Sequence, residues 1–418
     1  MSDDSHAQHS HRAVTLPEPE WFDPSKSSGL FRIIAGVALV AFVILAIAII
    51  LGWKNPALIQ QFAYSWLFGF LFFFTICAGS LFWIIVHYAT DACWSVVVRR
   101  QLENVAALFP FLALLFVPLI LFRESLWQWM SIVPGTDHLF DSKIWYFYPT
   151  VGGVTVPIYW IRLVLYGVFF IGAAWTFRDN STRQDKTGDP ETTIRLRGKS
   201  FWFLPLFALS LTFAAIDWVM ALDYKWYSTM WGVYIFAGSA GSSMAVLVLV
   251  VTLLKSKGYL ETVNLEHYHI MGKWLLVFTI FWAYIGFSQY MLIWYSNIPE
   301  ETSYFLLRNT ESWNILSTFL VVGHFFIPFA LLLNRWIKKK PAVLSIAAIW
   351  ILCMHLLDLY IIVLPNIHRE GVALSWLDFV CPVAIGSVLA LGFLSQIGKR
   401  SLFPARDPRL LESLRLTN

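Results

Sequence analysis

Ten stretches of this chain are long and apolar enough to cross a lipid bilayer, and this feature constrains the fold most. A membrane-spanning helix needs about 20 mostly apolar residues. The shortest stretch holds Pro110 and Pro118, and together with the amphipathic segment from Asp91 it predicts a kinked span. The sequence therefore predicts an all-α polytopic membrane protein with spans at approximately 33–52, 62–90, 104–122, 157–177, 201–222, 229–254, 274–296, 313–334, 342–364 and 376–397.

The composition supports a membrane protein and excludes a soluble multidomain enzyme. Charged residues make up 13% of the 418 residues, against about 25% in soluble proteins, and apolar residues make up 58%. The four cysteines lie singly in or beside apolar runs, without a C-x-x-C motif or a Cys/His cluster. We therefore expect no iron–sulfur cluster, c-type haem or metal site in this chain.

Polar segments flank the ten spans. Residues 1–30 show no helical or strand period and predict a polar tail, and residues 401–418 predict a second tail. A signal peptide would have a cationic start and a short apolar core near the terminus, so we expect the first span to be retained. The ten-span domain would then cover residues 31–400.

Lysine and arginine predict the orientation of the spans. Because ten spans alternate sides, 22 basic residues fall on the side of both termini and six on the other side, while Arg162 and Lys273 lie inside span ends. Loops rich in Lys and Arg stay in the cytoplasm. Both termini are therefore predicted to be cytoplasmic.

A weak internal repeat predicts two helical bundles. Span 2 contains Tyr-Ser-Trp at 64–66 and Ala-Gly-Ser at 78–80, and the region of span 6 contains Tyr-Ser at 227–228 and Ala-Gly-Ser at 237–239. Four crossings separate the two copies, so the halves would share one orientation. We expect four-helix bundles at about 60–225 and 226–365, flanked by spans 1 and 10.

Ionisable residues within the spans are the candidate functional residues. At bilayer depth each costs about 3 kcal/mol, so such groups normally face a protein interior or a wet cavity. Ordered by their depth in the membrane, these residues form a ladder, and Asp223 lies just beyond its outer end. The ladder consists of His87, Asp91, His269 and Lys273 on the inner side, His324 and His355 in the middle, and Asp217, Asp358 and Gln289 on the outer side.

Several interpretations of this ladder are open. The inner residues, with His267, are typical of water-exposed helix ends, and Asp223 with Lys225 is typical of a paired or solvated loop. Asp217, Asp358 and the two middle histidines could form structural interhelical hydrogen bonds, or His324 and His355 could ligate a b-type haem. A proton relay fits the ladder best, because it needs only carboxylates and imidazoles within reach of waters. A secondary transporter has weaker support, since only span 3 is broken by prolines.

Several motifs carry a resemblance to a known family. The chain resembles the smaller NrfD-like (ActF-type) membrane subunit of alternative complex III, a bacterial quinol:cytochrome c or quinol:electron-acceptor oxidoreductase. The similarity runs from about residue 60 to 397 in matching order. The motifs are Lys-Ser-Lys-Gly-Tyr-Leu-Glu at 255–261, Phe-Trp-Ala-Tyr-Ile-Gly-Phe-Ser-Gln-Tyr at 281–290, Trp94-Ser95 with Arg99, Asp217 to Asp223 with Trp226, and His355-x-x-Asp358.

The resemblance implies a non-redox subunit of a respiratory complex in the bacterial inner membrane. It implies partner subunits that carry haem c and iron–sulfur clusters, a larger NrfD-like subunit with quinol or menaquinol nearby, lipids, and in some complexes a terminal oxidase, but no nucleic acid. It also implies a proton path through Asp217, Asp223, His355 and Asp358. His87 and Asp91 match no family motif and rest on the ladder alone. Quinol binding by this chain itself remains an alternative.

Overall fold

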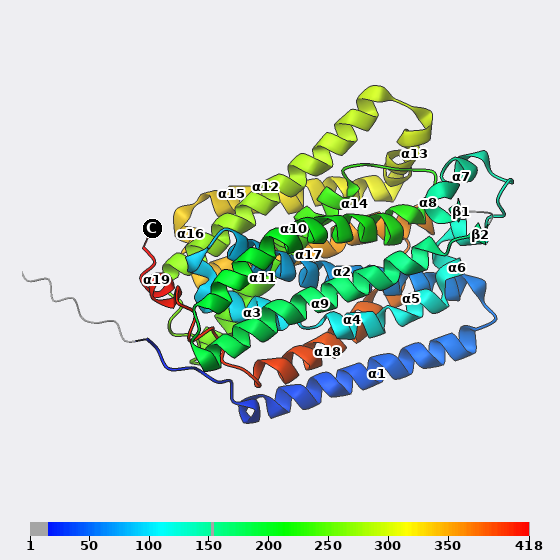
Figure 1. The fold of residues 1–418 in the computed structure, drawn as a ribbon. Coiled ribbons are helices and arrows are strands. Elements are labelled where there is room, and N and C mark those ends of the chain that lie inside the picture. Colours follow the sequence, from blue (N-terminus) through cyan, green and yellow to red (C-terminus); the bar gives the residue numbers. More distant parts are fainter. Residues whose placement is uncertain (1–15, 152–153, 418) are drawn as a thin grey trace, which may run out of the picture.

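The computed structural model describes residues 16–151 and 154–417, and helices dominate it (Figure 1). Ten spans within these residues are long and apolar enough to cross a membrane, which confirms the predicted all-α fold. The first two spans are α1 (Ser28–Gly52) and α2 (Pro56–Ala89). The third is broken into α3 (Val96–Ala106), α4 (Phe109–Leu115) and α5 (Val117–Leu121), and the fourth and fifth are α9 (Ile158–Thr187) and α10 (Glu191–Trp218). The last five are α11 (Trp231–Ser256), α12 (Leu265–Ser296), α14 (Glu311–Val321) with η5 (Val322–Phe326) and α15 (Ile327–Leu333), α17 (Pro341–Val363) and α18 (Leu377–Ile397).

Short elements connect the spans. Strands β1 (Thr150–Val151) and β2 (Val154–Thr155) pair antiparallel, with Thr150 opposite Thr155. The short helices are η1 (Pro24–Ser27), η2 (Cys93–Ser95), α6 (Arg123–Leu126), η3 (Gln128–Ser131), α7 (His138–Ser142), α8 (Ile144–Phe147), η4 (Met220–Leu222), α13 (Pro299–Arg308), α16 (Arg335–Lys338), η6 (Leu364–Asn366) and α19 (Leu410–Leu414).

Proline breaks the third span, as the sequence predicts. Pro110 lies in the first turn of α4 and Pro118 in the first turn of α5. Proline has no backbone N–H and fixes its own φ angle, so it is tolerated at a helix start but interrupts a continuous helix. The span therefore consists of three short helices rather than one.

The helices form two bundles joined at α2 and α11. Helices α2, α3, α4, α9 and α10 pack together, as do α11, α12, α15 and α17, while α18 packs on α2 and α1 packs on α18. The two Ala-Gly-Ser clusters lie where α2 meets α11. A Cβ on Gly79 would overlap the backbone of Ser239, so glycine allows the two backbones to approach closely.

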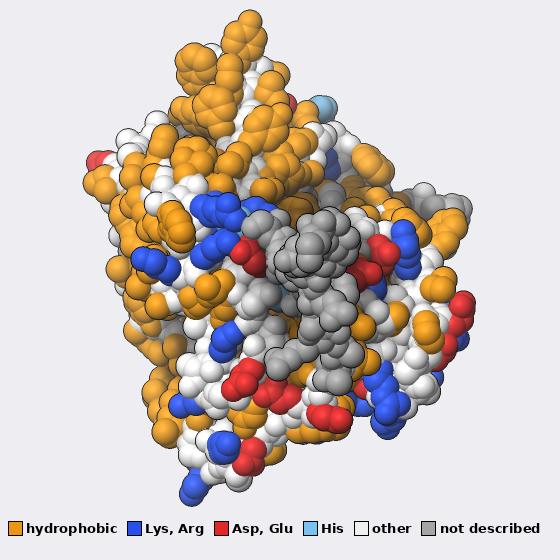
Figure 2. Space-filling view, turned by 90° about the vertical axis from the view of Figure 1, so that its left-hand side faces the viewer, with side chains coloured by type: hydrophobic (Ala, Val, Ile, Leu, Met, Phe, Trp, Pro, Cys, Tyr) orange, Lys and Arg blue, Asp and Glu red, His pale blue; other side chains and the backbone are white. Residues whose placement is uncertain are grey.

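Both ends of the described chain lie at one end of the molecule, which we call the terminal end (Figure 1). Helix α1 starts there and α18 finishes there, as an even number of spans requires. Figure 2 shows that acidic and basic side chains gather on this face, between apolar side chains at its margins. The opposite end carries the loops between α1 and α2, α5 and α9, and α12 and α14.

The segments predicted as tails pack against the helices where the structure describes them. Trp21 forms an isolated bridge with Ser401, and the amide of Leu402 donates to the carbonyl of Glu20 at 2.8 Å. Leu402 and Phe403 are buried, because these apolar side chains have helices to cover them. Residues 1–15 of the N-terminal tail, including Arg12, lie outside the described residues.

Candidate functional site

A buried carboxylate, Asp358 on α17, lies in the second bundle. Its side chain is 3% exposed. The hydroxyl of Tyr234 donates to Oδ1 at 2.6 Å, and Nε1 of Trp282 donates to Oδ2 at 3.0 Å. No described Lys, Arg or His forms an ion pair with it at 4.0 Å or less. Asp358 is therefore a buried acid held by neutral donors alone.

Two histidines of the predicted ladder lie in the same bundle as this acid. His355 lies one turn along α17, with Nε2 at 2.9 Å from the hydroxyl of Thr75 on α2. His324 lies edge-on to the Trp282 ring, with ring centroids 4.0 Å apart. Nδ1 of each histidine has no hydrogen-bond partner among the described residues. The two rings thus contact the surroundings of Asp358 from different helices.

A π-helical turn positions His324. The segment η5 is the one place in its span where the α-helical pattern is replaced, and it contains Gly323 and His324. Gly323 packs against Met354 of α17, and its carbonyl accepts a hydrogen bond from Nε1 of Trp350 at 2.7 Å. Such turns often occur at functional sites, because they redirect one side chain without ending the helix.

A stripe of residues on α2 runs from His355 towards the terminal end. Thr75, Gly79, Trp83 and His87 are four residues apart and share one helix face, about 18 Å from first to last at 1.5 Å per residue. Trp83 donates to the carbonyl of Ala240 on α11 at 3.0 Å. The same interface buries four serine hydroxyls, on Ser80, Ser239, Ser242 and Ser243.

His87 ends this stripe in a closed environment. It is 2% exposed, its ring lies between Trp83 and Trp94, and neither ring nitrogen has a partner among the described residues. The interpretation as a water-exposed helix end is therefore wrong for His87. It is also wrong for His267, which is fully buried and accepts a capping hydrogen bond from the amide of Asn264.

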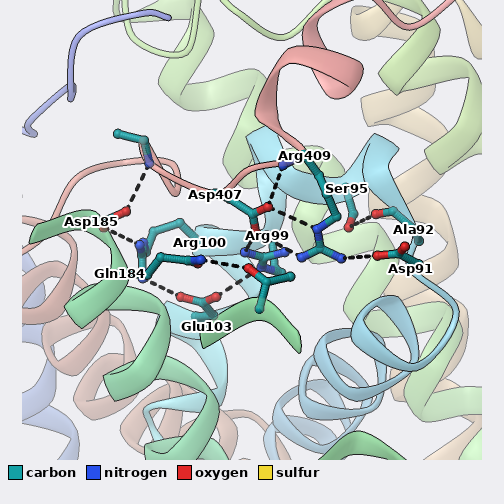
Figure 3. A network of polar contacts seen from close by, with 12 residues as sticks. Asp91, Ala92, Ser95, Arg99, Arg100, Glu103, Gln184, Asp185, Asp407 and Arg409 are labelled. Carbon is teal, nitrogen blue, oxygen red and sulfur yellow. Dashed lines mark hydrogen bonds and ion pairs between the residues drawn. The ribbon is translucent and has the colours of Figure 1, made fainter. Parts of the chain in front are cut away.

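A buried ion network lies at the terminal end of the molecule (Figure 3). Arg99 on α3 contacts Asp407 at 2.6 Å, and Asp407 contacts Arg409 at 2.9 Å. Burial alone would raise the pKa of the Asp407 carboxyl, but Arg99 and Arg409 outweigh burial and hold that pKa well below its usual value. Arg409 also reaches Asp91 at 3.1 Å. The network continues from Arg99 and Arg100 to Glu103 and Asp185.

Sequence reasoning missed this network. Its detectable signal was the pattern Arg99, Arg100 and Glu103 in the amphipathic segment that precedes the third predicted span. Asp91, which the ladder includes, is a partly exposed member that pairs with Arg197 as well as Arg409. The C-terminal segment supplies Asp407 and Arg409, and α9 supplies Asp185.

Asp217, from the ladder, is part of a different site in the first bundle. Nε and Nη2 of Arg162 on α9 each donate to one of its oxygens at 2.8 Å. The hydroxyls of Tyr146 and Tyr166 donate to it at 2.7 Å each. The structure therefore separates Asp217 from the Asp358 cluster and gives it a full set of partners.

The other ladder residues lie at the ends of helices. The Asp223 carboxylate accepts a hydrogen bond from the backbone amide of Lys225 at 3.1 Å, and no ion pair joins the two side chains among the described contacts. His269 lies 3.5 Å from Glu266, which also binds Lys339. Lys273 is exposed. None of these residues adjoins the α2 stripe.

A groove of about 920 Å³ opens beside Asp358. It lies between α12, α13, α14 and α17, where the far end of α12 diverges from the bundle (Figure 1). Asp358, Tyr234 and Trp282 line it together with aromatic side chains of α12. No group of three or more His, Cys, Asp or Glu residues suited to a metal ion occurs in the described part of the chain.

No family model matches this sequence, and no curated protein matches it. The chain is an integral multi-pass membrane protein with ten candidate spans.

Proposed function

We propose that this chain is a membrane subunit of a respiratory quinol-oxidising complex and that it conducts protons between Asp358 and the terminal end. In this proposal the terminal end is cytoplasmic, and the partner subunits carry haem c and iron–sulfur clusters. Quinol oxidation takes place in those partners. The chain itself anchors the complex in the bacterial inner membrane.

One observation carries the proposal: an acid that is buried in the bundle, with no counter-ion among the described residues, is followed by the α2 stripe, which starts and ends with a polar side chain. Asp358 borders the groove, His355 follows at one helical turn, and Thr75 links His355 to the α2 stripe. The stripe ends at His87, beside the terminal ion network. A buried ionisable group in a span is costly and marks a functional path by default.

Each group has a separate role along this path. Asp358 takes up and releases a proton, because neutral donors stabilise its charge less than a cation would. The imidazole of His355 passes the proton to waters held by the hydroxyls of Thr75, Ser80 and Ser239. His87 returns it to the terminal side. Asp217 contributes structure rather than conduction, because Arg162 fixes its charge.

The decisive experiment measures protons released per electron in vesicles that contain the assembled complex. Asp358→Asn keeps the shape and one acceptor while removing the titratable proton, so proton release should fall while quinol oxidation persists. Thr75→Val should lower it too, because the hydroxyl next to His355 is lost. Asp141→Asn, in a loop at the opposite end, is the control and should leave it unchanged. Unchanged stoichiometry in both test variants would refute conduction.

The orientation can be tested with single cysteines. In a background without the four native cysteines, a thiol at position 143 should react with an impermeant reagent added to intact cells, and one at position 186 should not. The opposite pattern would invert the topology and the proposed direction of the path.

The packing around the histidines opposes the b-type haem alternative. His355 contacts Thr75, Phe72 and Gly238, and His324 packs on Trp282, so side chains occupy the surroundings of both rings. The purified subunit should show no b-type band in a reduced-minus-oxidised spectrum. A band that disappears in His355→Ala would establish the cytochrome instead.

A further inference from the structure

The groove contains a buried cation, Arg308, that the proposed proton path does not use. Arg308 is the last residue of α13 and is 7% exposed. Its guanidinium donates to the carbonyls of Ile361 at 3.0 Å, Tyr304 at 2.9 Å and Ile362 at 2.7 Å, and it lies over the Tyr304 ring at 3.4 Å. These bonds fix the position of the charge.

Arg308 forms no ion pair with a described residue, and the acid that acts on it electrostatically, Asp223, lies beyond ion-pair distance. A guanidinium has five N–H groups, and the three carbonyls account for three of them. No carboxylate among the described residues lies within 4.0 Å of it. Carbonyl dipoles and a ring face partly offset the charge, but a buried cation is most stable beside an anion. Two N–H groups and one positive charge are therefore left for a ligand.

Asp358 lines the same groove but does not supply that charge. Its two oxygens already accept hydrogen bonds from Tyr234 and Trp282. Arg308 binds the carbonyls of residues 361 and 362, about one turn along α17 from residue 358, which is ~5 Å of helix rise. The positive charge of Arg308 thus lies further from the terminal end than Asp358 does.

The side chains that line the groove change from apolar to polar towards Arg308. Near Arg308 it includes small polar side chains, on Asn297, Thr302, Asn309, Asn314 and Thr318. Along α12 and α14 it is aromatic and aliphatic, and Phe287 and Trp294 are 63% and 66% exposed on a surface that faces lipid in a membrane. A polar end beside a helix terminus and an apolar, laterally open body match the two parts of a membrane lipid.

We propose that this groove binds one anionic phospholipid. Its phosphate accepts the two remaining N–H groups of Arg308, and an acyl chain lies along the walls formed by α12 and α14. Arginine suits this role because its planar fork binds phosphate through two parallel hydrogen bonds. The volume lies within the range of about 300–1,000 Å³ that is usual for ligand sites. The proposal does not depend on the proposed proton path, although Asp358 of that path lines the same groove.

Native mass spectrometry of the purified full chain can test the site. The probes are dioleoyl phosphatidylglycerol, dioleoyl phosphatidylcholine and inorganic phosphate. The wild-type chain should retain phosphatidylglycerol at least about tenfold more tightly than phosphatidylcholine, because only the anionic lipid brings an uncompensated charge to Arg308. Inorganic phosphate lacks the acyl chain and should neither bind nor compete.

Two variants and a control locate the binding. Arg308→Gln should abolish the preference for phosphatidylglycerol, and Arg123→Gln, an exposed cation at the same end, should preserve it. If Arg308→Gln fails to fold, Asn314→Trp decides the question, since this exposed side chain borders the groove and its enlargement leaves the bonds of Arg308 intact. It should weaken phosphatidylglycerol binding by a similar factor.

Three results would overturn the proposal. One is equal retention of the two lipids by the wild-type chain. Another is undiminished phosphatidylglycerol binding in the Arg308→Gln or Asn314→Trp variant. The third is displacement of phosphatidylglycerol by a neutral quinone whose own binding survives Arg308→Gln, which would assign the groove to a quinone.

Discussion

Asp217 and Asp358 occupy comparable places in the two bundles but have opposite surroundings. Each lies on the last helix of its bundle, α10 or α17, and each is almost fully buried. Asp217 receives two hydrogen bonds from Arg162 and one from each of two tyrosines. Asp358 receives one from Tyr234 and one from Trp282.

Under the proposed function, the difference separates a structural acid from one that can change its charge. A cation beside a carboxylate favours the ionised form, and buried ion pairs resist the loss of either partner. Neutral donors favour the ionised form less, so burial keeps the protonated form accessible. The predicted depth in the membrane placed both acids in one ladder, whereas the structure gives them different hydrogen-bond partners.

Removing the cation from Asp217 should have the largest effect on stability. Arg162→Leu leaves a buried carboxylate without its counter-ion, so the free energy of unfolding should fall by about 3–5 kcal/mol. Denaturant unfolding in detergent measures it. The double variant Arg162→Leu/Asp217→Leu should recover most of the loss, and a double variant as unstable as the single one would contradict this account.

Asp407 extends the comparison to a third buried acid, at the terminal end. Asp407→Asn removes the ion pairs with Arg99 and Arg409, so it should lower the free energy of unfolding. The loss should be only about 2 kcal/mol, because Arg99 keeps Glu103 and Arg409 keeps Asp91 as second partners.

The pH dependence of this loss follows from the lowered pKa of Asp407. A group with a lowered folded-state pKa gives its full stabilisation above the unfolded pKa of about 3.9 and loses it as the pH falls through the folded pKa. The difference between Asp407→Asn and the wild-type chain should therefore be equal at about pH 6 and pH 8. A difference that shrinks on going from pH 8 to pH 6 would show that the acid titrates in that range.

Deleting one tyrosine hydroxyl at each acid should sharpen the contrast. Tyr166→Phe removes a donor from a carboxylate that also contacts Arg162 and should cost about 1.5–2 kcal/mol, whereas Tyr234→Phe should cost about 1 kcal/mol. Thermal or denaturant unfolding of the two variants, compared side by side, measures this. A greater loss in Tyr234→Phe would indicate that Asp358 holds a permanent charge.

The smallest effect on stability should come from Asp358→Asn. The asparagine carbonyl can accept from Trp282 while its amide donates to the Tyr234 oxygen, so the free energy of unfolding should change by under about 1 kcal/mol. Asp217→Asn, by contrast, strips Arg162 of its counter-ion and should approach the effect of Arg162→Leu. Equal losses in the two asparagine variants would remove the distinction between the acids.

The sequence was sufficient for the spans, and it also singles out two residues of the candidate site. Apolar run lengths predict ten helices, and His355 and Asp358 stand out because ionisable residues are rare in such runs. The four-residue spacing of Thr75, Gly79, Trp83 and His87 was also visible and could have predicted the α2 stripe.

Pairings between helices could not be predicted in the same way. The contact between Arg162 and Asp217 depends on how α9 and α10 rotate and slide against each other, which run lengths do not determine. The groove depends on the divergence of α12, and the burial of Asp407 depends on the path of the chain after its last span. Each is a property of packing between segments rather than of any one segment.

The C-terminal segment has a consequence for how the protein is made. Arg99 leaves the ribosome some 300 residues before Asp407 and Arg409, which complete its surroundings. Before those residues are made, Glu103 is the one ion-pair partner of Arg99 among the described contacts. Closure of the network around Arg99 therefore depends on the segment after α18, and a chain truncated before residue 407 would lack both Asp407 and Arg409.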